Sequence, residues 1–315
     1  MTLTTAPTTP PVAPATPPAA VPATSPAAVP ATAPAVVPGV VGETVAGSGR
    51  GVVPVAPVKL WICPNDDLAP ALADLLAAHW LDEQERQTCG RFLFERDRRQ
   101  YLVAHTLVRR ALALEAGLAE TDLVIWRSSR GRPFLRPSPG GLPRGGAHLD
   151  FNLSHAGGYN LLGIVRRHRI GVDVERLDRD EQALATITQT FARAEREWVA
   201  GAPPGRLRER RVLRLWTLKE AYAKARGLGL GLPFDEFCFT LDDERGVRAF
   251  CPPADDRGGR WRFVELEPVP DVLAAVAVPA DDQQDPVLHL HYGFPWSRAA
   301  ARPVVLPDPV GDPPA

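Results

Sequence analysis

Two acidic residues alternate with apolar ones in the segment 170–175, Ile-Gly-Val-Asp-Val-Glu. On a β-strand, Asp173 and Glu175 share one face with Gly171, while the apolar residues point to the opposite face. Two carboxylates at this spacing lie about 7 Å apart and repel each other unless a positive charge lies between them. Mg²⁺ prefers carboxylate oxygens, so the pattern favours a divalent cation site. A solvated strand face is the alternative, although Gly171 leaves room for something to approach.

A second candidate group lies on a predicted helix. Trp216, Glu220 and Lys224 are spaced by four residues and therefore share one helical face. Trp216 belongs to an apolar stripe, which places Glu220 and Lys224 at the edge of the core. A half-buried Glu220 near two other carboxylates needs a cation, and a half-buried Lys224 could have a lowered pKa and serve as a base. The alternative is an ordinary surface pair that contributes about 0.2–0.5 kcal/mol.

Two turns could bind a phosphate. Ser154 and His155 end a predicted strand at a Gly-rich turn, where backbone amides and the imidazole could hold an anion. Neighbours on a strand point apart, so we exclude a nucleophilic Ser–His pair. The turn Gly131-Arg132-Pro133 presents one guanidinium suited to phosphate or carboxylate. The alternatives are a turn histidine with its hydrogen bonds satisfied and an ordinary hairpin.

The composition is that of a globular protein. The chain has 315 residues, of which 45% are hydrophobic and 23% charged, and its net charge is −1. This balance argues against general nucleic-acid or membrane binding. Residues 1–57 are dominated by Ala, Pro, Thr and Val and predict a disordered tail, and residues 296–315 predict a second, Pro-rich tail. We find no signal-peptide pattern and no apolar run of the roughly 18–20 residues that a membrane helix needs.

The four cysteines are Cys63, Cys89, Cys238 and Cys251, and none has C-x-x-C or metal-ligand spacing. They predict reduced thiols and, without a signal peptide, a cytoplasmic protein.

Hydrophobic periodicity predicts a mixture of helices and strands without strict β-α-β alternation, which is typical of the α+β class. The predicted helices are 68–85, 94–114, 182–200 and 206–226, and a loop is predicted over 137–146. The predicted strands are 58–62, 123–126, 149–154, 159–165, 170–175, 237–241, 247–251, 261–266 and 272–278.

These motifs, in this order, resemble the 4′-phosphopantetheinyl transferases of the surfactin-synthetase-activating (Sfp-like) type. The resemblance covers about residues 58–279 and rests on Gly131–Pro133, Phe151–His155, Gly171–Glu175 and Trp216–Lys224, and also on the basic helix that begins at Phe94 and contains Arg109. The W-x-x-K-E-A pattern further resembles the branch that serves secondary-metabolite synthases.

The resemblance implies a pseudodimer of two similar α+β halves, 58–167 and 168–295, with the active site in the cleft between them. It implies a monomeric, Mg²⁺-dependent enzyme that transfers the 4′-phosphopantetheine group of coenzyme A to a serine of an apo acyl or peptidyl carrier protein. No nucleic acid or membrane partner is implied. The alternatives are a catalytically silent module that binds coenzyme A or the carrier protein, and a metal-dependent phosphohydrolase.

The resemblance also implies roles for individual residues. Asp173, Glu175 and Glu220 would bind Mg²⁺, and Glu220, Lys224 or a water molecule would deprotonate the carrier serine. Coenzyme A would contact a larger set, namely Arg132, Pro133, Ser154, His155, Lys219 and Lys224. The family often has basic residues just before its first helix that hold the 3′-phosphate. Here only Arg86 and Arg91 are basic in the segment 85–91, which leaves Arg91 or Arg99 for this role.

Overall fold

The structure is a computed structural model that describes residues 57–136, 149–244, 246–257, 259–280, 287–296 and 302–304. Apart from Pro57, the predicted N-terminal tail lies outside the described residues, and so does the predicted loop 137–146.

The first half of the described chain contains a strand, three helices, a short hairpin and two longer strands. They are β1 (Val58–Pro64), α1 (Pro70–Trp80), α2 (Glu83–Cys89), α3 (Glu95–Ala116), β2 (Val124–Arg127), β3 (Pro133–Arg136), β4 (Leu149–Ala156) and β5 (Tyr159–Arg166). β5 lies between β1 and β4 and is antiparallel to both.

The second half repeats this order of elements. They are β6 (Gly171–Arg176), α4 (Glu181–Gln189), α5 (Arg193–Ala200), α6 (Arg206–Arg226), β7 (Cys238–Asp242), β8 (Gly246–Cys251), β9 (Trp261–Val269) and β10 (Val272–Pro279). β10 lies between β6 and β9 and is antiparallel to both, as β5 is to β1 and β4. Short 3₁₀ turns occur at 65–67, 120–122, 229–231 and 254–256. The α+β prediction is confirmed.

Two further strands extend the first sheet. β11 (Leu288–Tyr292) pairs in parallel with β1, and β12 (Arg302–Val304) pairs with the other edge of β11. The prediction of a loose C-terminal tail over 296–315 is therefore wrong for residues 302–304. The free edge of β11 offers unpaired backbone groups, and this short segment satisfies some of them.

Two predicted helices are each divided in the structure, because local caps compete with helix continuation. The helix predicted over 68–85 stops at Trp80, and Asp82 is the N-cap residue of α2. The Asp82 side chain accepts a hydrogen bond from the Glu85 amide, and the Glu85 carboxylate accepts one from the Asp82 amide. The helix predicted over 182–200 is divided into α4 and α5, where the Glu195 side chain accepts from the Ala192 amide.

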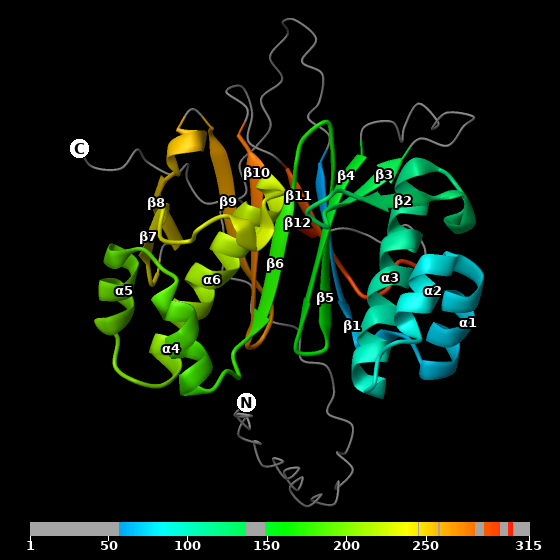
Figure 1. Cartoon of the computed structure of the whole chain (residues 1–315), viewed down its shortest axis with the longest axis horizontal. Coiled ribbons are helices and arrows are strands. Elements are labelled where there is room, and N and C mark those ends of the chain that lie inside the picture. The colour runs from blue at the N-terminus through cyan, green and yellow to red at the C-terminus, as the bar shows by residue number, and fades with distance from the viewer. Residues whose placement is uncertain are drawn as a thin grey trace, which may run out of the picture. The chain divides into compact units, whose positions relative to one another are not determined.

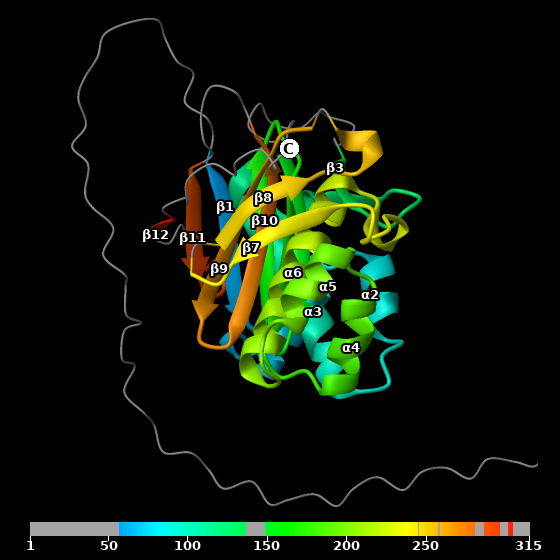
Figure 2. The ribbon, with the colours of Figure 1, turned by 90° about the vertical axis from the view of Figure 1, so that its left-hand side faces the viewer.

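The apolar core has three main layers. Residues of β1, β5, β6 and β10 pack against each other at the centre. α3 covers one side of these strands and α6 covers the other, each with its own apolar cluster. Figure 1 shows helices α1–α3 on one side of the central strands and α4–α6 on the other, and in Figure 2 α6 lies in front of α3.

Among the described residues, side chains of β4 and not a backbone ladder connect this strand to β6. Asp150 accepts a hydrogen bond from the Ile170 amide, and Asn152 accepts one from the Val172 amide two residues further on. Ser154 then donates to the Asp173 carboxylate. The alternation in this strand predicts one solvated face, but Asn152 and Ser154 are buried because their face meets β6.

Gly171 allows β6 and α6 to approach closely. A Cβ atom at this position would lie 1.9 Å from the Ala221 carbonyl oxygen and 2.5 Å from the Ala225 amide nitrogen. The room that Gly171 leaves is therefore occupied by the backbone of α6 and not by a ligand.

We expect Gly171→Ala to destabilise the protein by about 3 kcal/mol, because the backbone of α6 must move away from β6. Gly231→Ala is the matched control, since nothing lies within 4 Å of the added Cβ, and it should change stability by about 0.5 kcal/mol or less. Denaturant unfolding measures both. Equal stability of the two variants would contradict the close approach of β6 and α6.

Candidate active site

Three buried carboxylates lie where β6 packs on α6. Asp173 and Glu175 come from β6, and Glu220 comes from the middle of α6. Glu175 accepts a hydrogen bond of 2.7 Å from Arg179, just beyond the strand. The strand period gives Asp173 and Glu175 a common face, and the close approach at Gly171 brings the helix against it.

Lys224 lies one turn beyond Glu220 and reaches across to the strands. Its ammonium donates to Asp173 Oδ1 at 2.5 Å and to Ser154 Oγ at 3.0 Å. Ser154 also donates to Asp173 Oδ1 at 2.7 Å. Residues from β4, β6 and α6 therefore meet at one carboxylate oxygen.

The electrostatics of this group favour protonation of Glu220. Burial raises the pKa of Glu220 to about 7; the charges of Asp173 and Glu175 also raise it, and Lys224 opposes them. Burial likewise raises the pKa of Glu175 above its usual value, although the hydrogen bond from Arg179 lowers it. A group of acids held in this way would gain from a bound cation.

The donor set suits a hard divalent cation, although the side chains are not gathered around one point. Within the described part of the chain, no group of three or more His, Cys, Asp or Glu side chains has an arrangement that could hold a metal ion. Asp173 Oδ2, however, is buried and has no hydrogen-bond partner among these residues. Carboxylate oxygens are ligands that Mg²⁺ accepts, so the residues fit this ion.

A cavity of about 430 Å³ opens beside Lys224. Its wall carries several groups that could meet a polyanion, from α3, the β2–β3 hairpin, β4 and α6. They are His105, Arg127, Arg130, Arg132, His155 and Lys224. The cavity is therefore basic and adjoins the carboxylate group through Lys224.

Some of the predicted coenzyme A contacts lie at this cavity. His155 and Pro133 line it, and Ser154 is buried beside it against Lys224. Partial desolvation lowers the pKa of His155, and the charge of Lys224 lowers it further. An incoming phosphate would favour the protonated imidazole.

Arg132 also lines the cavity, but its guanidinium is engaged with the protein. It donates to Asp150 at 2.5 Å, to the Ile170 carbonyl oxygen at 2.9 Å and to the Lys224 carbonyl oxygen. The guanidinium thus ties the β2–β3 hairpin to β4, to the start of β6 and to the end of α6. Direct contact between Arg132 and a substrate stays a prediction.

The prediction that Lys219 contacts coenzyme A is wrong. The side chain is fully buried, and its ammonium donates to the carbonyl oxygens of Phe234 and Phe237, each at 2.7 Å. It also pairs with Glu195 at 2.8 Å. A residue next to Glu220 on a helix points about 100° away from it. Here that direction leads into the aromatic core below α6.

Neither Arg91 nor Arg99, the two arginines predicted to hold the 3′-phosphate, lines the cavity, so their contact with coenzyme A stays a prediction. Arg99 donates to the carbonyl oxygens of Asn65 and Leu68 and so fixes the loop after β1. Arg91 is exposed in the connection between α2 and α3.

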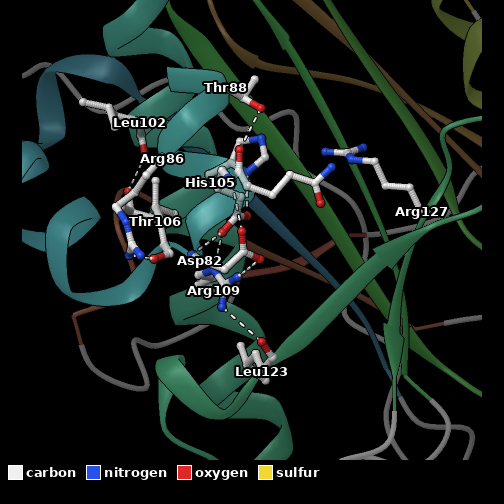
Figure 3. Close-up of polar contacts among 12 residues, drawn as sticks. Asp82, Arg86, Thr88, Leu102, His105, Thr106, Arg109, Leu123 and Arg127 are labelled. Atoms are coloured by element: carbon white, nitrogen blue, oxygen red, sulfur yellow. Dashed lines mark hydrogen bonds and ion pairs between the residues drawn. The ribbon is translucent and has the colours of Figure 1, made fainter. Parts of the chain in front are cut away.

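Sequence reasoning missed a buried network on the α3 side of the cavity. Arg109 is 1% exposed and donates to Glu85 at 2.7 Å and to Asp82 at 2.8 Å. Glu85 also contacts His105 Nδ1 at 2.8 Å, and the His105 ring stacks on Tyr101. Figure 3 shows His105 and Arg109 on α3 with Arg127 pointing toward them from β2. The one sequence signal was the spacing of Asp82 and Glu85, which forms a capping box.

Two family models match adjacent parts of the chain. The model described as 4′-phosphopantetheinyl transferase, N-terminal, matches residues 69–164, and the model of the 4′-phosphopantetheinyl transferase superfamily matches residues 169–277. The two matches adjoin in the connection between β5 and β6. No helix among the described residues is long and apolar enough to cross a membrane.

Similar proteins carry related names. A phosphopantetheinyl transferase from Thraustochytrium is 31% identical over 207 residues, covering 62% of this chain and 69% of the relative. The 4′-phosphopantetheinyl transferase HetI from Nostoc is 30% identical over 221 residues, covering 70% of this chain and 87% of the relative. A holo-(acyl-carrier-protein) synthase structure from Bacillus anthracis is 22% identical with a TM-score of 0.30, covering 35% of this chain and 94% of that chain.

The chain is thus a transferase by class, and it belongs to the 4′-phosphopantetheinyl transferase superfamily.

We expect Glu85→Gln to destabilise the protein at neutral pH by about 2 kcal/mol, because buried Arg109 loses a charged partner. Burial acts to raise the pKa of Glu85, but His105 and Arg109 outweigh it and the pKa is lowered. A lowered folded-state pKa contributes stability above the unfolded value of about 4.3, and this contribution is lost as the pH falls through the folded value.

Unfolding free energies of wild type and Glu85→Gln, measured from pH 7 to pH 3, should therefore converge toward acid pH. Glu83→Gln on the same helix is the control. Glu83 forms an exposed pair with Arg86 and should change stability by about 0.5 kcal/mol or less. A stability difference between wild type and Glu85→Gln that does not change with pH would contradict the assignment.

Proposed function

We propose that this chain transfers the 4′-phosphopantetheine group of coenzyme A to the serine hydroxyl of an apo carrier protein. The observation that carries the proposal is the contact of Lys224 with Asp173 and Ser154 beside the basic cavity. Carboxylates for a cation, a cationic side chain and a cavity for a polyanion lie next to each other. This is the set of groups that phosphoryl chemistry on a pyrophosphate requires.

Mg²⁺ is the cation that we propose for Asp173, Glu175 and Glu220. When bound, it supplies Lewis-acid stabilisation of charge on the phosphate oxygens. The unpartnered Asp173 oxygen and the raised pKa of Glu220 support this assignment, because both groups are better satisfied beside a cation.

Lys224 and Glu220 take separate roles in the proposal. Lys224 contacts Asp173 through its ammonium group and is proposed to hold a phosphate oxygen of the substrate. Glu220, which lies one turn before Lys224 on α6, is proposed to accept the serine proton, directly or through a water molecule.

The nucleotide end of coenzyme A is proposed to occupy the cavity. Arg127 and Arg130, on the hairpin between β2 and β3, supply positive charge at its wall. They take the place of Arg91 and Arg99 as candidates for the 3′-phosphate. His155, near the end of β4, lines the cavity together with Lys224 and would contact a phosphate from that strand.

The division of the chain into halves 58–167 and 168–295 is also a proposal. The repeated order of elements and the junction between the two family matches, at residues 164–169, support it. A single chain then contains both walls of the site, which is consistent with activity as a monomer.

The function is tested by incubating the protein with coenzyme A, Mg²⁺ and several apo carrier proteins and weighing each carrier intact. We expect a mass gain of one phosphopantetheine group on at least one carrier. Consumption of coenzyme A without a carrier would favour a phosphohydrolase. Binding of coenzyme A without consumption or transfer would favour a silent binding module.

Asp173→Ala should abolish transfer, because it removes a proposed ligand of the cation. The protein should stay folded, because the substitution removes one of three mutually repelling carboxylates. Asp178→Ala is the control, since Asp178 is an exposed acid just past the same strand, and it should keep full transfer. Full transfer by the wild-type protein in excess chelator would contradict the cation site.

Lys224→Arg separates a phosphate-binding role from a base role, because arginine keeps the charge and does not release a proton. We expect reduced but measurable transfer by Lys224→Arg and at least a further tenfold loss in Lys224→Ala, a difference of about 1.4 kcal/mol. Single-turnover transfer rates measure both. Equal inactivity of the two variants, with coenzyme A binding unchanged, would assign the base role to Lys224.

A further inference from the structure

The β7–β8 hairpin brings two cysteines together. Cys238 is the first residue of β7, Cys251 is the last residue of β8, and the two are directly opposite in the antiparallel register. Opposite residues in such a pair have Cα atoms about 4.5–5.5 Å apart. A disulfide needs Cα atoms about 4.4–6.8 Å apart, so the backbone already has the right spacing.

The pair lies on the outward face of the hairpin. The next opposed pair, Phe239 and Phe250, packs into the aromatic cluster below α6. Successive side chains on a strand point to opposite faces, so the two cysteines point away from that cluster. A bond between their sulfurs therefore leaves the aromatic packing as it is. Figure 2 shows β7 and β8 side by side in front of β9 and β10.

The two thiols differ in their exposure. Cys251 is exposed and Cys238 is partly exposed, whereas Cys63 and Cys89 are buried in separate apolar clusters. Burial, with a smaller contribution from Cys251, raises the pKa of Cys238 to about 11. Because Cys251 is the more exposed of the two, a dissolved oxidant reaches its sulfur first.

We propose that Cys238 and Cys251 form a reversible disulfide when the protein meets a peroxide. The Cys251 thiolate attacks one peroxide oxygen, so that an S–O bond forms, the O–O bond breaks and water leaves after protonation. Cys238 then attacks the sulfenic sulfur of Cys251. The S–S bond forms, the S–O bond breaks, and the Cys238 proton leaves with the hydroxide as a second water.

In total, two thiols and one hydrogen peroxide give one disulfide and two waters. A dithiol reductant restores both thiols by exchange through a mixed disulfide. The site does not depend on the proposed transfer reaction, since neither cysteine lines the basic cavity.

The test starts with the fully reduced, full-length protein. It is exposed to hydrogen peroxide, its remaining thiols are alkylated, and its intact mass and peptides are measured. We expect the loss of two hydrogens and of two alkylatable thiols, with one peptide pair joined through Cys238 and Cys251. Dithiothreitol should return both thiols.

Three variants check the assignment. Cys251→Ser should give no intramolecular bridge, and Cys238→Ser should leave a sulfenic acid on Cys251 that dimedone labels. Cys89→Ser is the matched control and should form the bridge as wild type does. The proposal is overturned if wild type keeps four alkylatable thiols, if the bridge joins another pair, or if oxidation yields only dimers linked through Cys251.

Discussion

The active site depends on a contact between β4 and β6, which belong to different sheets in the described part of the chain. Asp150, Asn152 and Ser154 reach from β4 to β6 and take the place of a backbone ladder. Asp150 accepts from the Ile170 amide just before β6 and Asn152 from the Val172 amide within it, and Ser154 donates to the Asp173 carboxylate. The backbone there is buried, so leaving these amides without partners would cost about 1–3 kcal/mol each. The same side chains that hold the two halves together therefore set the position of the first acid of the site.

Much of this arrangement could be predicted from the sequence, because it follows from simple periodicity. The period of two in 170–175 places Asp173 and Glu175 on one face, and the spacing of four places Glu220 and Lys224 on another, as the structure has them. α6 ends at Gly227, which has the left-handed φ of 70° expected for a helix stop. These features are local, and a few neighbouring residues decide them.

The other features depend on contacts between residues far apart in the sequence, which hydrophobic periodicity cannot predict. Lys219 is adjacent to Glu220 and carries the charge expected of a phosphate ligand. Its side chain is nevertheless fully buried, where it pairs with Glu195 and donates to two carbonyl oxygens just before β7. Cys238 and Cys251 show no metal or redox spacing, and only the hairpin register makes them neighbours. Gly171 was correctly singled out, but its partner was a helix backbone 50 residues away in sequence.

The two lysines of α6 show how one helix can serve both stability and chemistry. Lys219 and Lys224 each contact a buried carboxylate, Glu195 and Asp173 respectively. The Lys219 pair is closed, because both side chains are completely buried and carbonyl oxygens take the other ammonium hydrogens. The Lys224 pair is open, because the lysine side chain is 24% exposed and lies at the cavity wall. Breaking the closed pair leaves an uncompensated charge in the core, which costs about 3–5 kcal/mol. The open pair can exchange its partners at a smaller cost, since solvent, a phosphate or a cation can replace either group. Only the open pair can therefore take part in a reaction cycle.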